Sequence, residues 1–387
     1  MSMLWKANFY CINSIRLAIA SLFRGFRARP RPTHIIFCMV DHYEPGTGNV
    51  TRGTEEGRVE NLLRKFPKLV DCHRDSSGNV PKRTWFFPPH YHRYHSLKKL
   101  VSLCEGGYGE IELHLHHGKI RPDSPENLTR TIMQCIEEYS YFGIFGCEDG
   151  RKRYGFIHGD WALNNSRKGQ FCGVDNEIEI LGNTGCYADF TFPCFNEANP
   201  LQINSIYYAK NKTYKRKCYN RGTPVRVGSS GRGNLMIIQG PLHLFFKERK
   251  LLGLRIFRDS IDGTTPVTGD RIKMWVETCI HVKGKRDWVI VKVSTHGAAY
   301  EDAVLGKEMD SIYDYLEGDY NDGCDYILHY VSARELYNII KAAEAGEEGG
   351  NPEEYRNYKI SAPSYDSSAR ISEASDTLKS MVASTYR

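Results

Sequence analysis

Histidine and carboxylate side chains gather where the strand-like segments of this chain end. They are Asp41, His42, Glu44, His114, His116, His158, Asp189 and His296. Residues two apart in an extended strand point the same way, so His114 and His116 can face one ion while Leu115 faces the opposite side. Two imidazoles and one carboxylate beside an open position form the usual hydrolytic zinc site. The pattern therefore predicts a divalent metal centre, with zinc as the expected ion.

Such a centre needs a scaffold that brings strand ends together. From residue 33 onward, short hydrophobic or β-branched segments alternate with helical patterns, which is typical of parallel strands joined by crossover helices. The expected strands are residues 33–41, 84–88, 109–116, 154–160, 186–193, 235–240 and 287–296. Seven such units predict an α/β fold, a distorted (β/α) barrel of seven or eight parallel strands whose ends converge on one face. An open doubly wound sheet is the alternative.

Local signals place helix starts and domain limits. Ser124 followed by Pro125 is a favourable helix start, and Ser332 with Glu335 three residues later predicts a capping box. Residues 33–346 are therefore expected to form one main domain that ends in C-terminal helices. Residues 347–387 are rich in Gly, Ser, Glu and Asp with little apolar periodicity, which predicts a mobile tail.

Residues 1–32 differ from the rest, because aromatic and aliphatic side chains are interleaved with Lys and Arg. The apolar stretch is too short to span a bilayer. We expect a basic amphipathic segment that lies on an anionic membrane surface or binds a membrane-complex partner. An ordinary helix that covers the barrel is the alternative.

Composition limits the function classes. The net charge of +6 is modest, so the sequence lacks the electrostatic signature of a nucleic-acid-binding protein. The twelve Cys show no Cys-x-x-Cys and no paired spacing, which favours reduced, mostly buried thiols. We therefore expect a cytoplasmic protein, peripheral on the inner face of the membrane if residues 1–32 bind there.

Several of these segments resemble the polysaccharide deacetylases with a NodB-homology domain, over roughly residues 33–300. Residues 39–42 are similar to the family's first motif, residues 110–114 to the opening of its second, and His296 to the histidine near the end of its last strand. Gly118 stands where the second motif has its second histidine. The third motif, at residues 185–189, lacks the family's arginine and proline.

The resemblance implies a metal-dependent hydrolase that removes an acyl (acetyl) group from a carbohydrate. Residues 156–165 and 172–177 are similar to segments of exopolysaccharide-locus proteins, which implies a role in exopolysaccharide or glycan biosynthesis. In this interpretation His42, His114 and His116 hold the ion. Asp41 is the base, Glu44 its reserve, and His296 the acid that protonates the leaving group. Alternatively, Asp41 binds the ion and Glu44 is the base.

The acylated glycan would be bound by residues near the same strand ends. The candidates are His158, Trp161, Asn164, Asn165, Tyr187 and Asp189. Trp161 offers a flat apolar face of the kind that packs on sugar rings. Two other function classes stay open. One is a catalytically silent barrel that binds a glycan or scaffolds a membrane-associated synthesis complex. The other is a glycoside hydrolase, which needs two carboxylates flanking the scissile bond; the candidates are Asp41, Glu44, Asp160 and Asp189.

Overall fold

A computed structural model describes residues 30–369 apart from short gaps, which are residues 49, 90–93, 211–214, 230, 232, 234, 247–253 and 348–349. Almost all of the predicted amphipathic segment, residues 1–29, lies outside the described residues, as do residues 370–387. None of the helices in the described part of the chain is long and apolar enough to cross a bilayer.

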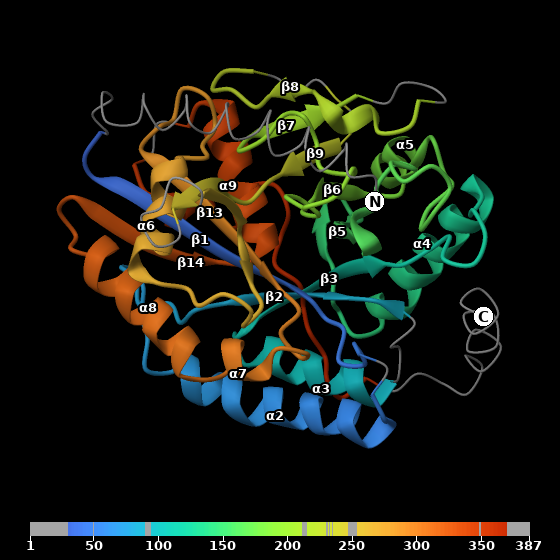
Figure 1. The fold of residues 1–387 in the computed structure, drawn as a ribbon, viewed down its shortest axis with the longest axis horizontal. Helices are drawn as coiled ribbons and strands as arrows, with labels where there is room; N and C mark the ends of the chain where they lie inside the picture. The colour runs from blue at the N-terminus through green and yellow to red at the C-terminus, as the bar shows by residue number, and fades with distance from the viewer. Residues whose placement is uncertain are drawn as a thin grey trace.

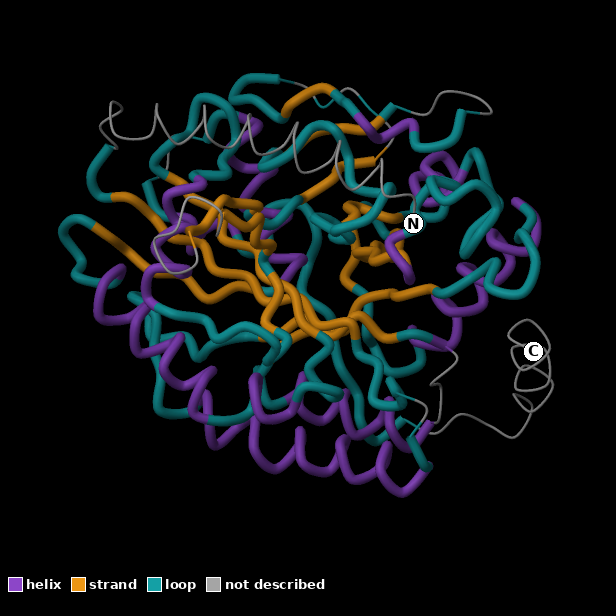
Figure 2. The backbone as a smooth tube through the Cα atoms, viewed as in Figure 1, coloured by secondary structure: helices purple, strands orange, loops and turns teal. Residues whose placement is uncertain are grey.

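One large, mostly parallel sheet of 12 strands runs through the molecule (Figures 1 and 2). Its strand order is β12-β13-β1-β2-β3-β5-β6-β9-β7-β8, with β14 paired to β1 and β4 paired to β5. The strands are β1 (Thr33–His42), β2 (Arg83–Phe87), β3 (Gly109–Leu115), β4 (Gly146–Glu148), β5 (Arg151–His158), β6 (Cys186–Asp189), β7 (Ile206–Ala209), β8 (Thr223–Pro224), β9 (Leu235–Ile238), β12 (Ser260–Ile261), β13 (Trp288–Thr295) and β14 (Tyr326–Val331). A separate antiparallel pair is formed by β10 (Leu242–Phe246) and β11 (Leu254–Arg258).

All seven expected segments form strands, namely β1, β2, β3, β5, β6, β9 and β13. The predicted count of seven is nevertheless too small, because shorter strands join the same sheet. Strands β4, β7, β8 and β12 span two to four residues, too few to produce a readable alternation. Strand β14, Tyr326–Val331, was also missed. The ten-residue β1 pairs with β14 along Thr33–Cys38 and with β2 along Met39–His42, so one strand edge accommodates two partners.

Helices cover both faces of the sheet. They are α2 (Arg52–Val70), α3 (Tyr94–Glu105), α4 (Pro125–Ser140), α5 (Glu177–Asn183), α6 (Gly269–Thr278), α7 (Glu301–Val304), α8 (Lys307–Tyr320) and α9 (Ala333–Ala345), with 3-10 turns η2 (Gly159–Trp161), η3 (Cys218–Asn220) and η6 (Pro352–Tyr355). Helices α2, α3, α7 and α8 lie along one side of the sheet in Figure 1. Both predicted helix starts are confirmed, since the Ser124 hydroxyl accepts from Asn127 N and Ser332 forms a capping box with Glu335.

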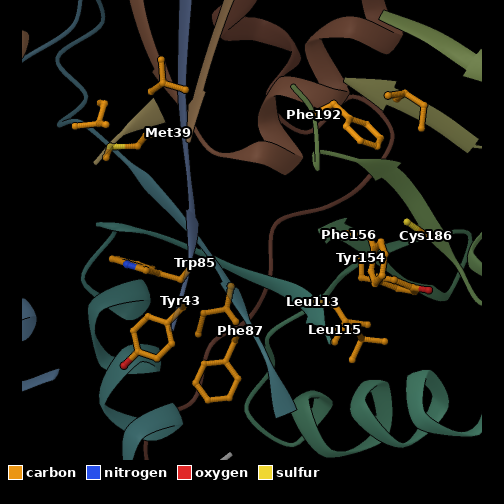
Figure 3. Packing of buried hydrophobic residues seen from close by; sticks show 14 of the residues in the cluster. Met39, Tyr43, Trp85, Phe87, Leu113, Leu115, Tyr154, Phe156, Cys186 and Phe192 are labelled. Atoms are coloured by element: carbon orange, nitrogen blue, oxygen red, sulfur yellow. The ribbon is translucent and has the colours of Figure 1, made fainter. Parts of the chain in front are cut away.

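Alternation along β1 separates two hydrophobic clusters. Ile35, Phe37 and Met39 belong to the cluster that also contains α2 and α8 side chains, here called the α2-side cluster. Figure 3 shows Met39 in this cluster with Trp85, Phe87, Leu113 and Leu115 of neighbouring strands. Ile36, Cys38 and Val40 face the α9-side cluster, which includes Leu336, Ile339 and Ile340 of α9. Adjacent residues at the end of β1 therefore face opposite layers.

Part of the expected mobile tail is packed against the domain. Arg356 donates to Glu335 at the start of α9, and Ile360 is fully buried. The Asn338 amide pairs with both backbone groups of Ile360, and the Tyr365 hydroxyl accepts a backbone N–H of β3. The sequence concealed this packing, because polar contacts to the backbone hold the segment in place of a periodic hydrophobic face.

Candidate metal centre

Four side chains meet at the ends of β1 and β3. Glu44 Oε1 lies 2.9 Å from His114 Nε2 and 2.6 Å from His116 Nε2, and these two nitrogens are 3.0 Å apart. The ligand atoms of His42, Glu44 and His114 all lie within 4.8 Å of one another. The structure thus brings together two imidazoles and one carboxylate, the ligand set of a hydrolytic zinc site.

Hydrogen bonds fix the orientation of both β3 histidines. His114 Nδ1 lies 2.8 Å from the carbonyl oxygen of Ile157, which can only accept, so Nδ1 donates and the Nε2 lone pair faces Glu44. His116 Nδ1 lies 3.1 Å from Asp160 Oδ2. Metal-binding histidines usually donate their other N–H to a carbonyl or a carboxylate. The His114 ring is therefore arranged as a metal ligand is, whereas His116 lies between the carboxylates of Asp160 and Glu44.

The charges at the centre also suit a cation. Burial opposes ionisation of Glu44, but its close contacts with the His114 and His116 imidazoles keep the pKa of this carboxyl well below its ordinary value. Burial, followed by the neighbouring His296, lowers the pKa of His42, which is therefore neutral at pH 7. Burial would lower the pKa of His116 too, yet its bonds to Asp160 and Glu44 raise it. An ionised carboxylate among imidazoles is what a divalent ion requires.

One side of the centre reaches solvent. His42 and His114 are buried, whereas the side chains of Glu44 and Asp160 are 13% and 29% exposed. The partly buried His296 ring stacks on His42 with centroids 4.5 Å apart. The partly buried Trp161 contacts His296 edge-on at 6.5 Å. The partly exposed carboxylates and the aromatic rings of His296 and Trp161 thus lie around His42 and His114.

Asp41 does not join this cluster, although it was expected to bind the ion or act as its base. Asp41 directly precedes His42 in β1, so the two side chains leave opposite faces of the strand. Its Oδ1 accepts from Gly297 N at 2.8 Å, and its Oδ2 lies 3.5 Å from Arg83 Nη1. Glu44, three residues beyond Asp41, supplies the carboxylate instead.

Most of the expected sugar-binding residues have structural partners elsewhere. The Tyr187 hydroxyl donates to Glu112 at 2.5 Å within the α9-side cluster, and buried Asp189 accepts from Thr191 Oγ1 at 2.6 Å. Asn164 and Asn165 both donate to Asp175. Trp161 contacts the centre through His296.

Sequence reasoning considered Asp160 only as a candidate carboxylate of a glycoside hydrolase, although it follows the β5 end by two residues and binds His116. It also missed that His158 lies with His117, Cys172 and Glu177 in a second buried cluster. The available signal was the alternation itself, because His116 and His117 are neighbours and must point to opposite sides.

Comparison with known proteins adds no family assignment. No protein-family model matches the chain. A search of curated proteins likewise finds no significant match.

Proposed function

We propose that this protein is a metal-dependent hydrolase that removes an acyl group from a carbohydrate. The observation that carries the proposal is the grouping of His42, Glu44 and His114 around one point, open to solvent on one side. The resemblance of the strand-end motifs to polysaccharide deacetylases supports the choice of an acylated glycan as substrate. Barrel closure belongs to the same proposal, and the parallel pairing from β12 through β9 supports it.

His42, Glu44 and His114 would hold the ion, with zinc as the first choice. A bound divalent ion supplies a water of lowered pKa and polarises the scissile carbonyl. His116 points at the same space, and Asp160 orients its ring and makes it more basic. We therefore assign to His116 the role of general base, which takes the proton of the attacking water. The sequence suggested Asp41 or Glu44 for this role.

His296 stacks on the His42 ring, which also contacts His114, and Trp161 and Tyr300 lie beside His296. From this place it can protonate the departing amine or alcohol of the sugar. The exposed part of Trp161 offers the apolar surface on which a sugar ring packs.

A glycoside hydrolase finds less support in this geometry. That reaction needs two carboxylates that flank a bond, about 5–10 Å apart across a cleft. Asp41 and Asp189 are fully buried and bonded to their own neighbours. Glu44 is engaged by both β3 histidines, and Asp160 is hydrogen-bonded to His116.

The test combines metal analysis with a direct assay. Purified full-length protein should contain bound metal and release acetate from N- or O-acetylated oligosaccharides. Glu44→Gln and His114→Ala should lose metal and activity together, whereas Glu137→Gln on the exposed face of α4 should lose neither. His116→Ala should keep most of the metal but lose turnover. Metal-free wild-type protein that releases no acetate from any such substrate would reject the hydrolase and favour a glycan-binding scaffold.

A further inference from the structure

A second cluster of metal-binding side chains lies on the other side of the sheet ends. His117 follows β3, His158 is the last residue of β5, Cys172 lies in the next loop and Glu177 is the first residue of α5. Their ligand atoms all lie within 4.8 Å of one another, and all four residues are buried. Figure 1 shows α5 beside β5 and β6, so the cluster joins two strand ends to one helix.

The His158 ring provides independent evidence for a ligand. Its Nδ1 lies 2.6 Å from the carbonyl oxygen of Gly159, which can only accept, so Nδ1 carries the hydrogen. Nε2 then presents a bare lone pair. This atom is fully buried without a hydrogen-bond partner, and it lies 3.4 Å from Glu177 Oε1. Two acceptors that face each other away from water are unfavourable unless a cation lies between them.

His117 and Cys172 also direct a ligand atom toward Glu177. His117 Nδ1 lies 3.0 Å from Asp123 Oδ2, while Nε2 lies 3.0 Å from Glu177 Oε1. A carboxylate behind a histidine is the usual support of a metal-binding imidazole. Cys172 Sγ accepts backbone N–H groups from Asn165 and Val174 and lies 3.4 Å from Glu177 Oε2. These N–H groups stabilise negative charge on sulfur.

We infer that His117, His158, Cys172 and Glu177 form a second, structural metal site that takes Zn²⁺. Two imidazoles, one thiolate and one carboxylate complete the four-coordinate shell that zinc prefers, and the two negative ligands balance its charge. The mixture of nitrogen and sulfur disfavours Ca²⁺ and Mg²⁺, which take oxygen ligands. The side chains of His158 and Glu177 are fully buried, so no open position remains for a substrate.

Such an ion would fix the loop between β5 and α5. Six non-glycine residues in this loop have left-handed backbone, Asp160, Trp161, Asn164, Asn165, Lys168 and Phe171. Backbone of this kind persists only where surrounding contacts impose it. The loop carries Asp160, which orients His116, and Trp161, which contacts His296. The second site would therefore position residues of the first centre. This consequence rests on the proposed function, whereas the existence of the second site does not depend on it.

Cobalt replacement in the full-length protein tests this site separately from the first, because only the second contains a thiolate. The Co²⁺ protein should show thiolate-to-metal charge-transfer absorption. Cys172→Ser should abolish that absorption and lower the metal content by about one ion per chain. Cys135→Ser, a buried thiol on α4, should change neither. Glu44→Gln should lose about one ion and keep the charge-transfer absorption.

Two outcomes would overturn the inference. One is a folded Cys172→Ser protein with unchanged metal content and spectrum. The other comes from X-ray absorption of the wild-type zinc protein, which does not depend on any variant folding. One sulfur among the zinc ligands is expected, and zinc bound without sulfur, or no zinc at all, refutes the site. Loss of acetate release alone does not bear on this result, since it reports on the first centre.

Discussion

The backbone N–H of Gly297 donates a hydrogen bond to Asp41 Oδ1 at 2.8 Å. Asp41 thereby joins the end of β1 to the turn that follows β13, on the face of the strand away from His42. Burial, opposed by the charge of Arg83, raises the pKa of this carboxyl to about 6. The residue that the family resemblance marks as catalytic thus has a structural environment.

Asp41→Asn is therefore expected to keep its metal. The asparagine oxygen can still accept from Gly297, but Arg83 loses a buried opposite charge. Removing one partner of a buried ion pair costs about 3–5 kcal/mol, so unfolding in denaturant should begin earlier. Elemental analysis of the folded variant checks the first point, and loss of metal there would restore Asp41 as a ligand.

His296→Ala should retain metal and fold yet lose turnover by about 10²- to 10⁴-fold, the usual contribution of one positioned acid or base. Removing the ring takes away its stacking on His42 but no metal ligand. Tyr300→Phe is the matched control, because it keeps an aromatic ring against His296. Acetate release by His296→Ala at the wild-type rate would reject the assigned role.

Asp160→Asn tests whether this carboxylate orients His116. Asparagine tolerates the left-handed backbone at φ 53°, so the loop should be preserved. Turnover should fall about 10- to 100-fold with metal retained. Because Asp160 helps raise the pKa of His116, the acidic limb of kcat/KM should move to lower pH in the variant.

The control for this change is Asp149→Asn, an exposed aspartate that has the same backbone conformation at φ 50°. It should leave both rate and pH profile unchanged. If the pH profile of kcat/KM for Asp160→Asn superimposes on that of the wild type, His116 does not depend on Asp160 for its role in the reaction.

Acid stability should depend on Glu335. Burial alone would raise the pKa of this carboxyl, but Arg356 and Lys82 lower it from 4.5 to about 2. A depressed pKa means that the stabilisation is complete above pH 4.5 and is lost as pH falls toward 2. The loss amounts to about 3 kcal/mol for a shift of this size. Glu335→Gln should therefore be less stable at pH 7 and show a flatter profile between pH 4.5 and 2.

Exposed Glu354→Gln, on the neighbouring turn η6, should follow the wild-type profile. Chemical denaturation at several pH values makes the comparison. Equal pH dependence in Glu335→Gln and wild type would show that other carboxylates dominate the acid transition.

Residues 1–32 are still expected to confer reversible membrane binding, a prediction made from their sequence. A chain that starts at Pro32 should stay folded but cosediment less with anionic liposomes. Added salt should also weaken binding of the full-length chain, because salt screening limits the reach of surface charges to about 8 Å at physiological ionic strength. Equal binding by both chains would contradict the prediction.

The main strands could be predicted because most of them alternate between the two hydrophobic clusters. The same alternation explains the pairing of His114 with His116. Local pattern could not show which carboxylate joins them, since Asp41 lies at the end of β1 and Glu44 just beyond it, and the path of the chain after the strand decides. The second cluster was harder still. His117 and Glu177 are 60 residues apart, and their meeting depends on β3 lying beside β5.

The segment at residues 351–366 has a consequence for the order in which the chain can fold. Synthesis proceeds from the N-terminus, so β3 leaves the ribosome long before Tyr365, which accepts its Ile111 N–H. Arg334 and Asn338 of α9 likewise bind backbone carbonyls around Arg356 and Ile360. Until those residues emerge, buried polar groups on β3 and α9 lack their partners. The sheet can therefore reach its final packing only after residues 351–366 have left the ribosome, and a ribosome that stops before residue 351 releases a chain with these groups unsatisfied.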